Sequence, residues 1–328
     1  MTLEGLLRLI VPAVLALFVA FTMDRRCAAR GLLPPGFREP WRRSLGSSLV
    51  GLILWIGAFA SLGNIGLEIE QDVSGLTTPR LFLLHGLLVL TLFIWFLLGF
   101  AGLRARPAPA PFEEIPLEEA PDIPVEPPPP SPAAPERMPL FRRFLEQFGF
   151  LAPNVPREIG IGLLLGIAAW GVVLAAALAM GGIVWALGGE DALPKQPPAL
   201  VPWIAALPVG VRILISLSAG VVEETFFRGF LQPRIGIFLS TLLFVFAHFS
   251  YGQPLMLVGI GTLSLIYALL VRWRQNIWPA IAAHVLFDAV QLLVVIPYAL
   301  RVMEKQGTSG PVASTMLGVL GLLFGLGN

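Results

Sequence analysis

The sequence predicts an all-α membrane protein, a polytopic helical bundle of about eight spans. Of the 328 residues, 56% are hydrophobic and only 13% are charged, and the mean hydropathy is +0.79. A soluble domain cannot bury so large a share of apolar residues in its core. Several apolar runs also reach the roughly 20 residues that a helix needs to cross a membrane. We expect these spans to be helical because lipid offers no partners to the polar groups of the backbone.

Seven apolar runs are long enough to cross, and we expect each of them to be a span. In chain order they lie near 5–22, 47–66, 81–103, 160–188, 205–227, 253–271 and 277–299. Two shorter runs, at 235–250 and 311–326, are also apolar. The bundle has eight spans if one of the shorter runs crosses, and nine if both do.

The placement of charge predicts the orientation of the chain in the membrane. The connection after the first run is rich in arginine, whereas the connection after the second run is acidic. The arginines are Arg25, Arg26, Arg30, Arg38, Arg42 and Arg43, and the acidic residues are Glu68, Glu70 and Asp72. Arginine-rich connections remain on the cytoplasmic side, so we expect a multi-pass protein of the cell (cytoplasmic) membrane with its N-terminus outside. The net charge of +1 and the lack of a long basic run give no indication of a nucleic-acid partner.

A proline-rich segment divides the chain into two membrane regions. Residues 105–139 hold 13 prolines and 7 acidic residues in the printed sequence. Such a composition cannot bury enough apolar surface to fold by itself, and its prolines favour an extended tether. We therefore expect a three-span N-terminal region at 1–104, a disordered cytoplasmic Pro/Glu-rich linker at 105–147, and a second membrane region at 148–328.

The second membrane region contains three polar clusters inside apolar runs, where an ionisable group is costly and points to a function. In the first cluster Glu224 and Arg228 are four residues apart, so they share one helix face and can form an ion pair. Glu223 is rotated by about 100°, which leaves it available for chemistry. A purely structural alternative is an ion pair at the end of a helix that reaches the membrane interface.

The second and third clusters also have helical spacing. Phe244 and His248 are four residues apart, and so are His284 and Asp288. Each unpaired group would have to be desolvated in the membrane, so we expect the three clusters to meet at one site. The remaining histidine, His85, lies alone in an apolar run. For it we expect a structural hydrogen bond or a position at the membrane interface.

These residue types suit the addition of water to a carbonyl group. A carboxylate can take a proton from water, an imidazole can share that proton, and other donors can stabilise the oxyanion that develops. The same carboxylates and imidazoles could instead bind a divalent metal such as zinc, with an open position for water. The sequence leaves both mechanisms open.

The three motifs together resemble those of the CPBP family of intramembrane proteases, which includes CAAX prenyl proteases and bacteriocin-processing or immunity (Abi-type) proteins. The matching segments are EETFFR at 223–228, FVFAH at 244–248 and HVLFD at 284–288. The resemblance covers roughly residues 160–300. It implies that 148–328 is a CPBP-like intramembrane endopeptidase domain, all-helical, with a site open to the cytoplasm.

The resemblance also implies roles for individual residues. Glu223 would activate water with His248 as its partner, and His284 with Asp288 would stabilise the oxyanion and position the substrate. Family members most often carry asparagine at the position of Asp288, and an ionised aspartate there would repel an oxyanion. Glu224, which is counted with the catalytic residues, and Arg228 would support the geometry of the site, and Phe244 is a further supporting position.

The leading functional hypothesis is therefore hydrolysis of peptide bonds in a membrane-associated protein or peptide, with or without a lipid anchor. The expected partners are this substrate and the lipid bilayer. Two other hypotheses remain open at this level. One is a non-catalytic membrane scaffold or immunity-type protein in which the polar clusters hold the helices together. The other is a proton- or ion-coupled transporter that uses the carboxylates as relays.

Overall fold

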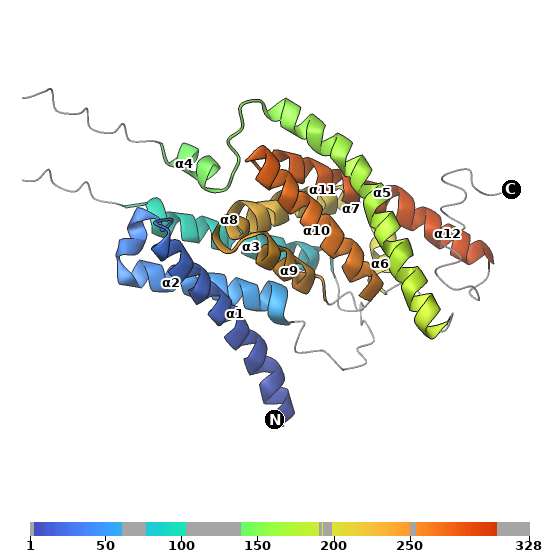
Figure 1. Ribbon diagram of the computed structural model, residues 1–328, viewed down its shortest axis with the longest axis horizontal. Coiled ribbons are helices and arrows are strands. Elements are labelled where there is room, and N and C mark those ends of the chain that lie inside the picture. Colours follow the sequence, from blue (N-terminus) through green and yellow to red (C-terminus); the bar gives the residue numbers. More distant parts are fainter. Residues whose placement is uncertain are drawn as a thin grey trace, which may run out of the picture.

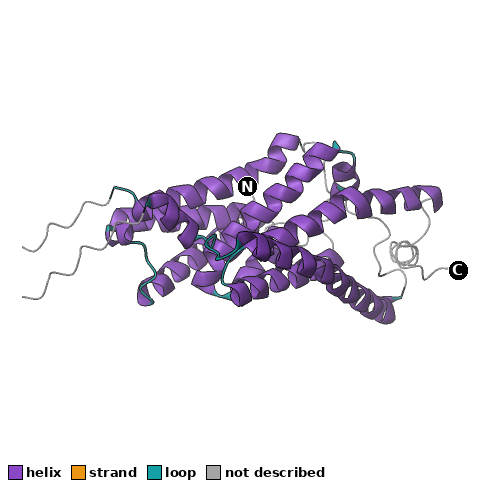
Figure 2. Ribbon diagram, turned by 90° about the horizontal axis from the view of Figure 1, so that it is seen from above, coloured by secondary structure: helices purple, strands orange, loops and turns teal. Residues whose placement is uncertain are grey.

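The computed structural model describes residues 3–60, 77–102, 139–189, 192, 199–249 and 254–306. These residues form helices joined by loops, and the described part contains no strand (Figure 2). The prediction of an all-α fold is therefore confirmed. In Figure 1, α1 and α2 lie toward one end of the molecule and α12 toward the other, with α3, α8, α9 and α10 between them.

The N-terminal region consists of three long helices with short irregular turns. They are α1 (Leu3–Ala29), α2 (Pro40–Leu54), which continues into a π-helical turn at Trp55–Phe59, and α3 (Thr78–Phe100). A 3₁₀ turn at Pro35–Arg38 connects α1 to α2. Arg43 on α2 donates two side-chain hydrogen bonds to Asp24 Oδ2 on α1, at 2.9 and 2.6 Å, which ties the two helices together at one end.

The C-terminal region begins with α4 (Leu140–Gln147) and the long α5 (Val155–Gly188). It continues with α6 (Leu200–Ala205), α7 (Val209–Ser218), α8 (Gln232–Ile235), α9 (Ile237–Ala247), α10 (Pro254–Arg274), α11 (Trp278–Val290) and α12 (Ile296–Gln306). Helices α7 and α8 belong to one continuous helical stretch, which is interrupted by two π-helical turns, η5 (Ala219–Glu223) and η6 (Thr225–Leu231). A further π turn at Gln291–Val295 joins α11 to α12.

Five of the described helices are long and apolar enough to cross a membrane. They are Gly5–Ala29, Thr78–Phe100, Val155–Gly188, Met256–Arg274 and Trp278–Val302. The run predicted at 47–66 is helical over its described residues 47–60, and the run at 205–227 is helical except at residues 206–208, which connect α6 to α7. Both runs contain π-helical turns. The shorter run at 235–250 contains α9, and the run at 311–326 lies outside the described residues. The protein is thus a multi-pass membrane protein.

The predicted linker is helical at its C-terminal end. Residues 140–147 form α4, and its Phe144 packs edge-on against Phe96 of α3, with ring centroids 5.3 Å apart. The expectation of disorder up to residue 147 is wrong for these eight residues, because aromatic side chains anchor them to the bundle. Residues 105–138 of the linker lie outside the described part of the chain.

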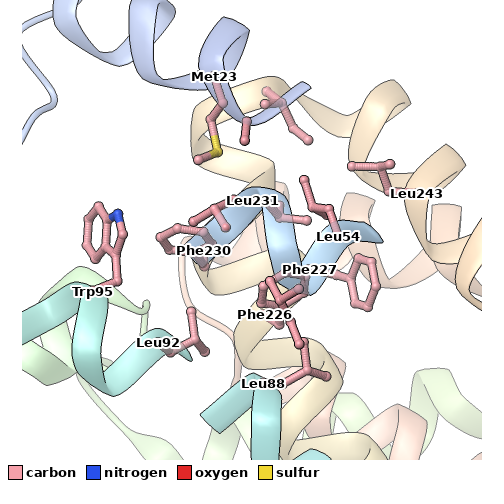
Figure 3. Close-up of a cluster of buried hydrophobic side chains, with 14 of the residues drawn as sticks. Met23, Leu54, Leu88, Leu92, Trp95, Phe226, Phe227, Phe230, Leu231 and Leu243 are labelled. Carbon is pink, nitrogen blue, oxygen red and sulfur yellow. The ribbon is translucent and has the colours of Figure 1, made fainter. Parts of the chain in front are cut away.

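The N-terminal helices share one apolar core with the C-terminal region. Figure 3 shows side chains of both regions in this core, among them Met23, Leu54, Leu88, Leu92, Trp95, Phe226, Phe227, Phe230, Leu231 and Leu243. Trp95 of α3 meets Phe230 of η6 edge-on, with a centroid distance of 4.9 Å. The guanidinium of the buried Arg234 lies over both rings. Helix α3 is therefore held against the helix that carries the first polar cluster.

Small residues allow α11 to approach its neighbours closely. A Cβ atom on Gly162 of α5 would lie 2.8 Å from the Cβ of Ala282, and a Cβ on Gly220 of η5 would lie 3.0 Å from the backbone nitrogen of Val285. Such small residues at helix contacts are typical of membrane proteins, where close backbone packing drives association. The contact at Gly220 brings the first and third polar clusters together.

Candidate active site

The two adjacent glutamates lie where the helix from α7 to α8 departs from regular geometry. Glu223 is the last residue of the π turn η5, and η6 begins at Thr225. Single π turns inside helices are frequent at functional sites, because the extra residue in the turn changes the direction of the side chains that follow. Here Glu223 and Glu224 point to different partners, as their predicted angular separation requires.

Glu224 is the centre of a fully buried ion-pair network. Its Oε1 atom lies 3.0 Å from Arg228 Nη1 and accepts a hydrogen bond of 2.8 Å from His284 Nδ1. The side chain of Glu224 is 0% exposed and that of Arg228 is 1% exposed. The predicted ion pair is therefore present, and its burial excludes the alternative of an interfacial salt bridge. Because His284 belongs to the third cluster, this network joins two of the clusters.

Arg228 is held in place by several groups besides Glu224. Its Nη2 atom donates to the hydroxyl of Ser264 at 3.0 Å and to the carbonyl of Ser264 at 3.2 Å. The guanidinium also lies over the ring of Phe244, 4.3 Å from the centroid. Phe244 and Arg228 are therefore in direct contact, and their supporting roles stay a prediction.

Glu223 faces a different set of groups. Its Oε2 atom is 3.9 Å from Nε2 of His248, and its Oε1 atom is 3.2 Å from Nε2 of His85. Nδ1 of His248 lies 2.8 Å from the carbonyl oxygen of Phe244. A carbonyl only accepts, so Nδ1 must carry the proton, and in the neutral ring Nε2 presents its lone pair toward Glu223. The first and second clusters thus meet as predicted.

Oε2 of Glu223 is buried and has no hydrogen-bond partner among the residues that the structure describes. A buried carboxylate oxygen in this state is costly unless another group or a substrate engages it. The separation of 3.9 Å from His248 is too long for a direct hydrogen bond. Glu223 and His248 are therefore close enough to contact the same reacting atom, and they are not hydrogen-bonded to each other.

His284 lies between two carboxylates. Its Nδ1 atom is bound to Glu224, and its Nε2 atom is 3.6 Å from Oδ2 of Asp288. The ring of Tyr267 stacks on the imidazole, with a centroid distance of 5.2 Å and an interplanar angle of 24°. The ring centroid of Phe244 lies 6.1 Å from that of His284. All three polar clusters therefore meet in one region of the bundle.

His85 is part of this arrangement, although the sequence pattern had given it no partner. Besides Glu223, it contacts Ser218, whose Oγ atom is 2.6 Å from Nδ1 of His85. The expectation that His85 makes a hydrogen bond is confirmed, but one of its partners is Glu223, a residue of the predicted site. The partners follow 133 and 138 residues later, so helical spacing could not reveal them. The sequence signal for a polar partner was the free-energy cost of placing an imidazole in an apolar membrane helix.

A cavity of about 440 Å³ lies beside His85, between α3 and the helix that carries Glu223. Its lining is almost wholly apolar and includes Phe82, Val89, Phe93 and Val222, with His85 and Ser218 as polar members. It is an open hollow on the surface of the bundle, since Val89 and Phe93 are each 51% exposed. The cavity thus gives the polar cluster an apolar approach on the side of α3.

Two features of the described residues disfavour a bound metal. Among the described residues, no group of three or more histidine, cysteine, aspartate or glutamate side chains is arranged to hold an ion. Glu224 already faces the guanidinium of Arg228, a fixed positive charge that disfavours a cation at this oxygen. The Glu224 oxygen is therefore a poor ligand for a metal ion.

Comparisons with known proteins find a match over the part of the chain that contains the three motifs. A family model described as type II CAAX prenyl endopeptidase Rce1-like matches residues 205–290, a stretch that includes all three motifs. The uncharacterized protein YpbD of Bacillus subtilis (strain 168) is 33% identical over 79 residues, which is 24% of this chain and 42% of that protein. The chain thus spans less than half of this curated relative. No solved structure matches the chain. The C-terminal half therefore carries an Rce1-like region at residues 205–290, which confirms the family resemblance predicted from the three motifs.

Proposed function

We propose that this protein is an intramembrane endopeptidase that hydrolyses a peptide bond in a membrane-associated protein or peptide. The observation that carries the proposal is the buried Oε2 atom of Glu223, which has no hydrogen-bond partner among the described residues and lies 3.9 Å from Nε2 of His248. A carboxylate and an imidazole so placed can share the proton of an attacking water molecule. The Rce1-like match over 205–290 supports the same reaction class.

In the proposed first step, Glu223 Oε2 takes a proton from water while the water oxygen bonds to the carbonyl carbon of the substrate. The carbonyl π electrons move to its oxygen and form an oxyanion. The proposed hydrogen-bond donors to that oxyanion are Asp288 in its protonated form and His284 as an imidazolium, which donates from Nε2 because its Nδ1 proton is held by Glu224. The C–N bond then breaks, and the leaving nitrogen takes the proton from Glu223 directly or through His248.

Glu224 has a different proposed role, that of fixing His284. Its hydrogen bond to Nδ1 orients the imidazole, and Arg228 balances its charge. A buried carboxylate without a cation would be strongly disfavoured. The pair of glutamates thus divides into one reacting group and one supporting group. The proposed mechanism needs no metal, and activity should survive a chelator.

The proposed orientation follows from the distribution of arginine. The connection between α1 and α2 and the linker at 105–147 would lie in the cytoplasm, with the N-terminus outside the cell. The proposed location is the cell membrane, and the substrate would reach the site from the cytoplasmic side. The substrate class is a protein or peptide held at the membrane by an apolar segment or by a lipid anchor.

Cleavage of two membrane peptides tests the proposal. The purified protein in phosphatidylcholine vesicles is mixed with internally quenched peptides of one sequence, one carrying a farnesylated cysteine near its C-terminus and one anchored by an apolar helix. We expect cleavage of at least one peptide by the unaltered protein and its loss in Glu223→Gln and His248→Ala. Glu114→Gln is the matched control, because Glu114 belongs to an adjacent glutamate pair in the proline-rich segment. Failure to cleave either peptide, or unchanged cleavage by Glu223→Gln, contradicts the proposal.

A non-catalytic scaffold remains the second candidate, and one observation favours it. The network of Glu224, Arg228 and His284 is buried inside the helix bundle, where it could serve only to hold helices together. If the contacts of Glu223 with His85 and His248 served the same purpose, Glu223→Gln would alter stability or assembly rather than turnover. Thermal unfolding of this variant in detergent separates the two candidates, because a catalytic role leaves the midpoint almost unchanged.

A further inference from the structure

A chain of hydrogen bonds connects the N-terminal region to Glu223. Ser218 Oγ is 2.6 Å from Nδ1 of His85, and Nε2 of His85 is 3.2 Å from Oε1 of Glu223. His85 belongs to α3, which lies outside the matched segment at 205–290. The side chains of His85 and Glu223 are 15% and 14% exposed. One carboxylate oxygen of the proposed base is thus engaged from a helix that the family match does not include.

The direction of these hydrogen bonds follows from the chemistry of the groups. An ionised carboxylate only accepts, so Nε2 of His85 must carry a proton and donate it to Oε1 of Glu223. In the neutral ring Nδ1 then presents a lone pair, which accepts the hydroxyl proton of Ser218. The carboxylate of Glu223, which only accepts, therefore fixes the tautomer of His85, and the hydroxyl of Ser218 satisfies the remaining ring nitrogen.

The consequence concerns the orientation of the Glu223 carboxylate. A carboxylate can rotate about its terminal bond, because this torsion is broad and weakly restrained. With Oε1 bound by His85, the other oxygen is directed toward His248, 3.9 Å away. An error of about 1 Å in the placement of a reacting group can lower a rate by up to about 100-fold. Loss of the hydrogen bond from His85 should therefore lower the rate of the reaction at Glu223.

We propose that His85 is a positioning residue for Glu223, and that the N-terminal region thereby completes the active site. The proposal rests on the function proposed above, since it assigns Glu223 the role of the reacting base. His85 acts through Glu223 and does not contact the reacting atoms. A purely structural histidine that joins α3 to α7 would make the same contacts, so the test must separate positioning from stability.

The first arm of the test measures the hydrogen bonds without any assay of activity. The chain has only three histidines, so nitrogen-15 labelling of histidine gives a simple spectrum, and His85→Gln identifies the signals of His85. We expect an Nε2-protonated ring for His85. Its nitrogen shifts should change in Ser218→Ala and in Glu223→Ala, whereas Leu83→Ala, an exposed position of α3, should leave them unchanged. An Nδ1-protonated ring, or signals insensitive to both variants, overturns the proposal.

The second arm measures kcat and KM on whichever of the two quenched peptides the unaltered protein cleaves. His85→Leu removes the donor and should lower kcat by about 10- to 100-fold with KM within about twofold. His85→Gln places an amide N–H near the position of Nε2 and should restore most of kcat. Equal loss in both variants, or a change in KM alone, overturns the positioning role.

The outcomes distinguish the two proposals. If Glu223→Gln is inactive while His85→Leu keeps its kcat, the endopeptidase proposal stands and the positioning role is wrong. If Glu223→Gln cleaves normally, or if neither peptide is cleaved, the proposed function is wrong. In that case the positioning role fails with it, and the nitrogen-15 spectrum still reports whether the hydrogen-bond chain exists.

Discussion

The buried ion pair of Glu224 and Arg228 predicts a large loss of stability when its negative charge is removed. Glu224→Gln keeps the shape of the side chain and leaves an amide oxygen for His284. It also leaves the charge of Arg228 without its carboxylate at a position that is 1% exposed. Breaking a buried pair by removing one partner costs about 3 to 5 kcal/mol. At about 2 °C per kcal/mol for a chain of this size, the midpoint should fall by about 6 to 10 °C.

Thermal unfolding of the purified protein in detergent measures this effect. Glu223→Gln is the matched control, since the same substitution one residue earlier removes a carboxylate whose ion-pair partners among the described residues are histidines. We expect its midpoint to stay within about 2 °C of the unaltered protein. The double variant Glu224→Gln with Arg228→Met should recover much of the loss, because it removes both charges. An unchanged midpoint in Glu224→Gln, or a double variant less stable than either single one, would refute this reasoning.

Three further predictions concern the site and its packing. Asp288→Asn should retain most of the cleavage activity, because the amide can donate to an oxyanion, whereas Asp288→Ala should lower kcat at least tenfold; equal activities would remove Asp288 from the site. Gly220→Val should lower the free energy of unfolding by about 1 to 3 kcal/mol, since its Cβ would lie 3.0 Å from the nitrogen of Val285; an unchanged midpoint of thermal unfolding would contradict this packing. Excess chelator should leave the cleavage rate unchanged, and loss of activity that zinc restores would refute the metal-free mechanism.

Much of the fold could be predicted because the bilayer imposes strong local rules. Composition and the length of apolar runs predicted an all-helical, multi-pass bundle. The π turns at η5 and η6 could not be predicted from periodicity, since a turn of this type depends on the packing around it. The helix α4 was also missed, because the prolines before it suggested that the linker extended to residue 147. Aromatic contacts with α3 stabilise α4, and no local pattern reveals them.

Contacts within the site could be predicted where both residues lie on one helix. The spacing of Glu224 and Arg228 predicted their ion pair, and the angular separation of the two glutamates predicted their different surroundings. His85 was missed because its partners lie on another helix, far along the chain. The pairing of His284 with Glu224 was likewise beyond helical spacing. Contacts between distant segments depend on how the helices pack, and a single sequence does not encode them in a local pattern.

The central claim is that Glu223 activates water for peptide-bond cleavage within the membrane. Its most direct test is cleavage of the quenched peptides in ¹⁸O-labelled water, with the products weighed by mass spectrometry. The unaltered protein should yield a fragment whose new C-terminal carboxylate contains one ¹⁸O atom, and Glu223→Gln should yield no such fragment while unfolding at the same temperature. The same labelled fragment from Glu223→Gln, in equal amount, would contradict the claim.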